Sequence, residues 1–394
     1  MKYSTNPVSG EKLSRLGLGC MRFPRTGSRI DQEKTNELVD AAIKKGVNFF
    51  DTAYIYPGSE EALGKALRIL GAREKVNIGT KLPHYTCKKT EDIDRIFNSQ
   101  LKRLQTDYVD YYFMHMLSNI GSWERLKAFG IIDWIKEKRS TGVIRNIGFS
   151  FHGGRDSFIE LLDAYKWEFC MVQYNYYDEN NQASSVGVRA AFEKGLPVIA
   201  MEPLLGGTLV NGLPNEAIQA FGKVSKERSL ADWAFRWLLN QQEVTIALSG
   251  ISNLAELTEN CAIVDDCEPE ELSEEESTAY KTVVAVLSKS MKVKCTGCGY
   301  CMPCPKGVDI PTCFSAYNAR YAFGFIDGMS EYVQNTGLTT PKQSDASKCV
   351  SCGICEKHCP QSISIAKELK KVNQKMLGSI LKPMFFIARK ILKI

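Results

Sequence analysis

The sequence predicts an α/β protein in which a closed (β/α)8 barrel is followed by a small, mainly helical domain. Two observations predict this organisation. Short apolar runs alternate with longer amphipathic stretches through residues 12–262, a pattern typical of parallel βαβ units. Nine of the fourteen cysteines crowd into residues 295–359, whereas five are scattered over residues 1–290. The crowded cysteines therefore mark a second domain.

Eight apolar runs are candidate strands of the barrel. They are LSRLGLG (13–19), GVNFFDTA (46–53), KVNIGTKL (75–82), YVDYYFMH (108–115), IRNIGFS (144–150), FCMVQYN (169–175), PVIAMEP (197–203) and VTIALSG (244–250). Eight βα units within ~250 residues favour a TIM barrel over an open, doubly wound sheet. No GxGxxG motif follows the first run, which also argues against a doubly wound dinucleotide-binding sheet.

Helical patterns fill the intervals between these runs. In residues 31–46 apolar side chains recur at helical spacing, and Gly46 provides a C-terminal stop. Similar patterns occupy residues 59–70, 91–104 and 125–142. Residues 264–291 are predicted to form an acidic loop and a helix that lead out of the barrel.

Composition and charge narrow the class of protein. The chain is 44% hydrophobic and 24% charged, with a net charge of +5, and no basic block interleaved with aromatic residues predicts nucleic-acid binding. The N-terminal sequence lacks the apolar core of a secretory signal, and no stretch reaches the ~18 apolar residues of a membrane span. We therefore expect a cytoplasmic protein. In that reducing compartment, cysteines are expected as metal ligands or buried thiols rather than disulfides.

Ionisable residues stand at the ends of three consecutive predicted strands. Asp51, Lys81 and His115 occupy these positions, and Tyr56 lies in the loop after Asp51. Such residues converge at the mouth of a barrel. The set suits carbonyl reduction: Tyr56 would protonate the developing alkoxide if Lys81 lowers its pKa, Asp51 would hold Lys81, and His115 would orient the carbonyl oxygen. Each residue alone is more often a cap or an ion-pair member; the combination predicts the chemistry.

Over residues 12–262 the sequence resembles the aldo-keto reductase family. The resemblance rests on GLGCMR, FFDTAYIYPGSEEALGKAL, GTKL, the strand that ends at His115, IGFS, VQYN, EPLLGG and ELTEN. It implies that Asp51, Tyr56, Lys81 and His115 are the catalytic tetrad, with Tyr56 as the general acid.

The same resemblance implies a nicotinamide site. Ser150 and Gln173 would hold the carboxamide, Gly206 would lie in the loop over the pyrophosphate, and Glu259 and Asn260 would contact the adenine.

Three positions depart from the family's pattern. Met201 stands where the family usually stacks an aromatic residue on the nicotinamide ring, and Met201 can pack there less rigidly. Gly250 and Glu256 stand where the family often binds the 2′-phosphate of NADP with a Lys and an Arg. A carboxylate repels a phosphate, so these departures argue against a preference for NADPH. They leave NADH, or weak nicotinamide binding, open.

Two cysteine motifs define the second domain: Cys295-x2-Cys298-x2-Cys301-x2-Cys304-Pro305 and Cys349-x2-Cys352-x2-Cys355-x3-Cys359-Pro360. The second is the run that bacterial ferredoxins use for [4Fe–4S] clusters, in which the fourth cysteine ligates the other cluster. The first is one residue shorter. The pair predicts two [4Fe–4S] clusters. The alternative is zinc, which usually takes two CxxC pairs without a third cysteine in the run.

Ferredoxin analogy assigns the ligands of each cluster. Cys295, Cys298, Cys301 and Cys359 would hold one cluster, and Cys349, Cys352, Cys355 and Cys304 the other. Because the first motif is short, Cys313 competes with Cys304 for the last position. The 44 residues between the motifs contain helical patterns, which resemble the helical ferredoxin-like domains. Cys20, Cys87, Cys170, Cys261 and Cys267 are expected to be ordinary thiols.

We therefore divide the chain into a barrel (1–285), a ferredoxin-type 4Fe–4S domain (286–375) and a basic amphipathic tail (376–394). The tail is typical of a helix that lies on a membrane surface, on a partner or on its own domain. The barrel followed by these two motifs resembles an iron–sulfur subgroup of the aldo-keto reductases in anaerobic microbes.

The combination predicts an oxidoreductase whose partners are a small carbonyl-type substrate and a ferredoxin-like electron carrier. A nicotinamide transfers two electrons as hydride, whereas a cluster carries one, and coupling them normally takes a flavin or a similar mediator. No flavin signature is evident. Two alternatives remain: an ordinary nicotinamide-dependent reductase with structural or redox-sensing clusters, or an electron-transfer protein with no substrate of its own.

Overall fold

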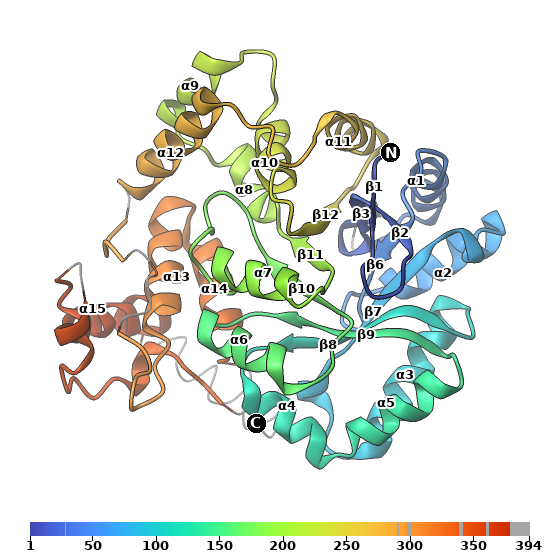
Figure 1. Cartoon of the computed structure of the whole chain (residues 1–394), viewed down its shortest axis with the longest axis horizontal. Helices are drawn as coiled ribbons and strands as arrows, with labels where there is room; N and C mark the ends of the chain where they lie inside the picture. Colours follow the sequence, from blue (N-terminus) through green and yellow to red (C-terminus); the bar gives the residue numbers. More distant parts are fainter. Residues whose placement is uncertain are drawn as a thin grey trace.

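The computed structural model of the chain describes residues 1–27, 29–289, 291–295, 297, 301–338, 342–359 and 362–378. Eight parallel strands close into a barrel in the order β10-β11-β12-β3-β6-β7-β8-β9 (Figure 1). The strands are β3 (Leu16–Gly19), β6 (Phe49–Asp51), β7 (Asn77–Leu82), β8 (Val109–Leu117), β9 (Ile144–Phe151), β10 (Phe169–Gln173), β11 (Val198–Met201) and β12 (Val244–Gly250). The predicted barrel is confirmed, and each strand lies within or beside its predicted run.

Helices surround the strands on the outside of the barrel (Figure 1). They are α1 (Gln32–Lys44), α2 (Ser59–Leu70), α3 (Thr90–Leu104), α4 (Ile120–Ala128), α5 (Ile131–Ser140), α6 (Arg155–Ala164), α7 (Ser184–Glu193), α8 (Thr208–Asn211), α9 (Asn215–Val224), α10 (Leu230–Leu239), α11 (Leu254–Asp266) and α12 (Glu274–Ser288). The predicted single helix over residues 125–142 is two helices, α4 and α5. Gly130 separates them with a positive φ of 76°, a conformation that breaks a right-handed helix.

The N-terminal end of the barrel is closed by a hairpin of β1 (Tyr3–Thr5) and β2 (Lys12–Ser14). Leu13 of β2 belongs to the apolar cluster inside the barrel, together with Phe49 and Tyr111. Asn6, in the hairpin turn, donates a hydrogen bond from Nδ2 to the Tyr111 hydroxyl at 3.0 Å. The opposite end, where the strands finish, is therefore the open end available for a site.

The acidic segment after α11 leads into α12, as predicted, but α12 is part of the barrel's outer layer. Ser273 and Glu276 form a capping box at its start. Tyr280 of α12 packs edge-on against Trp233 and Phe221 at ring-centroid distances of 5.4 Å. The domain boundary expected at residue 285 stays a prediction, and α12 continues through it to Ser288.

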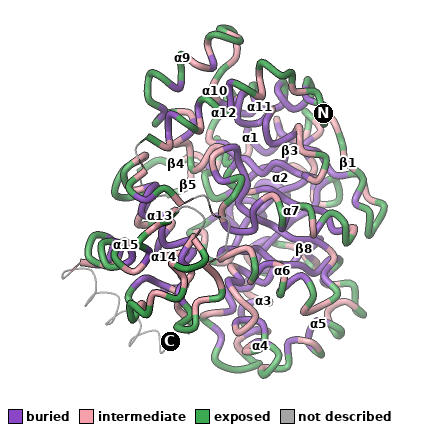
Figure 2. The backbone as a smooth tube through the Cα atoms, turned by 60° about the vertical axis from the view of Figure 1, so that its left-hand side comes forward, coloured by how far each residue is buried: buried purple, intermediate pink, exposed green. Residues whose placement is uncertain are grey.

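The C-terminal region is mainly helical, as predicted. Its helices are α13 (Ile310–Ala322), α14 (Phe325–Asn335) and α15 (Ile365–Val372), followed by a π-helical turn over Asn373–Leu377. A separate apolar core holds these helices together, and the described cysteines of both motifs except Cys352 pack around it. Figure 2 shows buried residues of α13 and α14 beside the barrel, with α15 toward the outside.

This region rests on the loops that follow three barrel strands. A Cβ atom on Gly154, after β9, would lie 2.4 Å from Asp309 Oδ2. The rings of Tyr177, after β10, and Phe323 are 4.8 Å apart. A Cβ atom on Gly121, in the first turn of α4 after β8, would lie 3.3 Å from Lys342 Cδ. The C-terminal region therefore sits on the open end of the barrel, over its β8–β10 side.

No helix in the described part of the chain is long and apolar enough to span a bilayer. Most of the basic tail, residues 379–394, lies outside the described residues. Its predicted role on a surface therefore stays a prediction.

Candidate active site

The strand register brings the predicted charged pair together. β6, β7 and β8 are neighbours in the barrel, and Asp51, Lys81 and His115 lie at or near their carboxyl ends. Lys81 Nζ donates hydrogen bonds to Asp51 Oδ1 at 2.5 Å and to the Thr52 carbonyl at 2.8 Å. Asp51, Lys81 and His115 are all buried, with residue exposures of 1% to 4%.

Tyr56 reaches the same place from the loop between β6 and α2. Its ring centroid lies 5.3 Å from Lys81 Nζ. The His115 ring lies 6.2 Å from the Tyr56 ring, edge to face. The structure thus brings all four predicted residues together at the mouth of the barrel.

Burial sets the protonation of this group. Desolvation raises the pKa of Asp51 and lowers that of Lys81, and in both cases it outweighs the attraction within the pair. The pKa of His115 is lowered well below its usual range, first by burial and then by the charges of Lys81, His152 and His84. His115 is therefore a neutral imidazole at neutral pH.

The predicted lowering of the Tyr56 pKa is wrong for this arrangement. Burial, then the negative charges of Asp51 and Glu202, raise the pKa of Tyr56 well above its usual value. These effects outweigh any lowering by the Lys81 ammonium, which is itself bound to Asp51. Tyr56 consequently keeps the proton that a general acid must hold.

Two further histidines, which the sequence analysis missed, lie at this end of the barrel. His84 follows β7 and His152 follows β9; both are buried, and burial lowers the pKa of each to about 4. His152 Nδ1 is 3.2 Å from Gln182 Oε1. The Nδ1 atoms of His84 and His115 have no hydrogen-bond partner among the described residues. The signal was present, because both histidines lie within two residues of a predicted strand end.

The residues expected to hold the nicotinamide carboxamide lie on β9 and β10. Ser150 Oγ accepts a hydrogen bond from the Met116 amide at 2.9 Å. Gln173 Nε2 donates to Asp178 Oδ2 at 2.7 Å. Both side chains are buried and held in place. Met201, at the end of β11, is half-buried and packs against the apolar interior of the barrel.

The remaining predicted cofactor residues lie near β11 and β12. Gly206 is exposed, with a φ of +66°. Asn260 is buried on α11 and donates from Nδ2 to Ser249 Oγ at 3.1 Å, whereas Glu259 is exposed. Glu256 accepts hydrogen bonds from the amide and the hydroxyl of Ser252, at 2.8 and 3.0 Å. Its carboxylate is thus engaged locally.

Arg22 is a cation that the sequence analysis did not select. Its Nη2 donates to the Gly206 carbonyl at 2.9 Å. A Cβ atom on Gly250 would lie 2.8 Å from Arg22 Cδ, so a larger residue at position 250 would force the arginine side chain to shift. Arg22 therefore links the two loops where phosphates were expected, and a guanidinium beside exposed backbone fits an anionic pyrophosphate.

The cysteines form the second candidate site. Cys304 and Cys349 are within electrostatic reach of Cys355, whose pKa is raised first by burial and then by neighbouring charges that include both. The Ser351 amide donates to Cys349 Sγ at 3.4 Å. Ser351 and Gly353 have positive φ values of 57° and 72°, which curl the chain around the sulfur. This donor set, thiolates with an amide aimed at one sulfur, fits an iron–sulfur cluster.

The rival ligand Cys313 lies elsewhere. It is fully buried in the apolar core of the region, and its Sγ is 3.7 Å from the Ser344 carbonyl. The geometry favours Cys304 over Cys313. Cys298 lies outside the described residues. Among those described, no group of three or more Cys, His, Asp or Glu is arranged to hold one metal ion.

Comparison with known proteins agrees with this description. A model of the aldo/keto reductase family matches residues 15–283, and a model of the 4Fe-4S dicluster domain matches residues 294–364. The uncharacterized oxidoreductase YrpG of Bacillus subtilis is 30% identical, over 53% of this chain and 68% of its own length. L-galactose dehydrogenase of Arabidopsis thaliana is 27% identical, over 66% of this chain and 87% of its own.

Solved structures show the same barrel. The holo form of aldo-keto reductase AKR11C1 from Bacillus halodurans superposes with a TM-score of 0.59 at 24% identity. An aldo-keto reductase from Klebsiella pneumoniae, solved in complex with NADPH, gives 0.58 at 23% identity. Each match covers 72% of this chain and 96% of the other.

Proposed function

Because the chain belongs to the aldo/keto reductase family and carries a 4Fe-4S domain, we propose that it reduces a carbonyl-type substrate with Tyr56 as the general acid. The electrons would come from a nicotinamide, from 4Fe–4S clusters, or from both. The observation that carries the proposal is the buried Lys81–Asp51 pair with Tyr56 and His115 beside it.

Each residue has a distinct task in this reaction. Neutral His115 donates a hydrogen bond to the carbonyl oxygen and fixes its position. Tyr56 gives its phenolic proton to that oxygen as negative charge develops. Lys81, held by Asp51, lies close enough to the Tyr56 ring to favour the phenolate that the transfer leaves.

The cofactors supply the electrons. A nicotinamide, when bound, supplies a hydride; Ser150 and Gln173 would hold its carboxamide, Met201 would pack on its ring, and Gly206, Glu259 and Asn260 would contact the rest. A [4Fe–4S] cluster supplies single electrons. We propose two such clusters, one on Cys295, Cys298, Cys301 and Cys359, the other on Cys349, Cys352, Cys355 and Cys304.

An anaerobic titration with NADH and then NADPH tests how the two halves are linked. We expect the cluster absorbance to bleach as nicotinamide is oxidised, with two electrons delivered per nicotinamide. Bleaching would require a one-electron mediator in the path. Nicotinamide binding without bleaching would contradict the linked path, and it would favour clusters that serve structure, sensing or an outside donor.

Arg22 provides a separate test of the cofactor site. Replacing it (Arg22→Ala) removes the only charge joining the Gly206 and Gly250 loops among the contacts described above. We expect the Kd for NADH to rise about tenfold, which corresponds to the loss of one charge-assisted hydrogen bond to phosphate. Quenching of intrinsic fluorescence measures this Kd. The control is Arg29→Ala, which removes an exposed arginine of β5 (Arg29–Ile30). Equal affinity in Arg22→Ala and wild type would contradict the role.

A further inference from the structure

We propose that the second cysteine motif forms a docking face for a small acidic protein that carries one electron at a time. The face comprises Val350, Cys352 and Ile354, with Lys306, Lys348 and Lys357 around them; we call it the carrier face. The inference rests on the proposed cluster-linked function. It adds the partner's chemistry and the surface where the partner binds.

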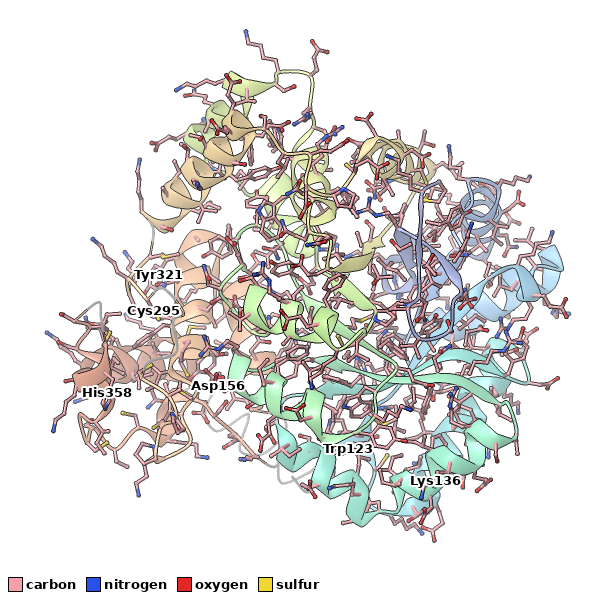
Figure 3. The ribbon with its side chains drawn as sticks, viewed as in Figure 1. Trp123, Lys136, Asp156, Cys295, Tyr321 and His358 are labelled. Carbon is pink, nitrogen blue, oxygen red and sulfur yellow. The ribbon has the colours of Figure 1, made fainter. Side chains whose placement is uncertain are left out.

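The two cysteine motifs differ in their surroundings. Gly297 of the first motif lies against the barrel, because a Cβ atom there would be 2.5 Å from the Asn180 carbonyl oxygen. Asn180 belongs to the loop after β10, whose Asp178 binds Gln173. The second motif lies toward solvent: Cys352 is exposed, and Figure 3 places His358 at the outer edge of the molecule, away from the barrel.

Apolar side chains flank Cys352 on the surface. Val350 is 58% exposed and Ile354 is 48% exposed. These two and Cys352 alternate along residues 350–354. A small apolar centre beside a redox group, bounded by charge, is the anatomy of a transient protein interface.

The surrounding charge is positive. Lys348 precedes the first cysteine of the motif, Lys357 follows Cys355, and Lys306 adjoins Gly307, whose Cβ position is 3.6 Å from Lys348 Nζ. Lys306 and Lys357 are exposed. Residues 286–375 contain twelve Lys and Arg against six Asp and Glu, a net charge of +6 in a chain whose total is +5.

The acidic side chains of this region are largely used internally. Asp309 and Asp345 cap helices, accepting from the Thr312 and Ser347 amides. Glu356 accepts from the Ala366 amide at 2.9 Å, and Glu331 accepts from Ser315 Oγ. The lysines therefore dominate the electrostatic field at the surface of this region. A positive field attracts an acidic partner and repels a basic one.

The electron count is simple. A reduced carrier loses one electron, a cluster gains it, and no bond is made or broken. Reduction of a carbonyl to an alcohol takes two electrons, which two carrier encounters deliver. It also takes two protons: Tyr56 gives one, and solvent supplies the other and reprotonates Tyr56.

The test compares the wild-type full chain, reconstituted anaerobically, with Lys306→Glu/Lys357→Glu. The control is Lys102→Glu/Lys136→Glu on α3 and α5; Figure 3 shows Lys136 on the opposite side of the molecule from His358. Calorimetric titration with an oxidised acidic [4Fe–4S] ferredoxin should give a Kd that rises with ionic strength. We expect the carrier-face variant to raise that Kd by about tenfold or more, and the control to leave it unchanged.

A measurement of reduction rates distinguishes weakened docking from a damaged cluster. Reduced ferredoxin should bleach the clusters of the carrier-face variant more slowly than those of the wild type, whereas reduced methyl viologen should bleach both at one rate. Horse cytochrome c, a basic carrier, should not bind. The proposal is overturned if the carrier-face variant binds ferredoxin as tightly as the wild type does, or if the Kd does not change with salt concentration. It is also overturned if the wild type binds phosphatidylglycerol vesicles but not ferredoxin.

Failure of docking and failure of the proposed function are distinguishable. Tyr56→Phe should bind ferredoxin and bleach as the wild type does, because docking does not involve the carbonyl chemistry. If ferredoxin docks and reduces the clusters but no carbonyl compound is reduced by the wild type, the carrier face stands and the proposed function fails.

Discussion

Tyr56→Phe should abolish carbonyl reduction while leaving the iron–sulfur absorbance intact. The phenol has a proton to give and lies beside both His115 and Lys81, and loss of a general acid costs roughly 10²- to 10⁴-fold in rate. The measurement is kcat for an aldehyde, with nicotinamide or reduced viologen as the electron source. Phenylalanine fills the same space, so the fold should be unaffected.

The matched control is Tyr54→Phe. Tyr54 lies two residues earlier, and its ring packs on the Arg103 guanidinium at 4.4 Å, so its hydroxyl has no part in the proposed chemistry. Undiminished activity in Tyr56→Phe would mean that another group donates the proton.

The pH profile adds a second readout for the same variant. His115 has a pKa lowered well below its usual range, so it stays neutral near neutral pH, and its ionisation should cause no inflection there in the wild-type rate. Lys81 must be protonated, and burial lowers its pKa. Activity is therefore present below that lowered pKa and lost as the pH rises through it. Residual activity of Tyr56→Phe should lack this alkaline fall.

Cys352→Ser should remove about half of the iron if the domain holds two [4Fe–4S] clusters. Serine is a poor ligand for iron in such clusters, and the first motif does not depend on residue 352 in the ligand assignment above. Iron and sulfide per chain, measured after anaerobic reconstitution, give the result, and the electron paramagnetic resonance spectrum shows which signal disappears.

Two companion variants make this experiment specific. Cys304→Ser should lose as much iron as Cys352→Ser, whereas Cys313→Ala should keep it, since Cys313 is buried in the apolar core. Unchanged iron in Cys352→Ser would contradict two clusters. Loss of iron in Cys313→Ala alone would exchange the roles of Cys304 and Cys313.

The barrel could be predicted from the sequence because its strands are buried on both faces and read as apolar runs. The charged tetrad residues stood out against those runs, so their convergence followed from the topology. The pKa of Tyr56 did not follow: the sequence predicted that Asp51 would hold Lys81 near Tyr56, but only the fold shows that burial governs the pKa of Tyr56.

Contacts between residues far apart in the sequence were the other limit on prediction from the sequence. Arg22 precedes Gly206 by 184 residues, and nothing local in GLGCMR marks the arginine as part of a phosphate site. The break at Gly130 was missed for a different reason. The apolar periodicity continues across Gly130, and a single glycine within a helical pattern does not by itself predict a positive φ.

The placement of the C-terminal region on the loops after β8, β9 and β10 has an evolutionary consequence. In most barrels the sequences of these loops vary freely, because only substrate binding constrains them. Here Gly154 must remain small to admit Asp309, and the loop containing Asn180 must keep its path beside Gly297. The open rim is thus divided into a sector constrained by an internal interface and a sector, after β11, β12 and β3, that carries the proposed cofactor residues Arg22 and Gly206. Both sectors are therefore constrained, and new substrate specificities should arise at the few rim positions outside them.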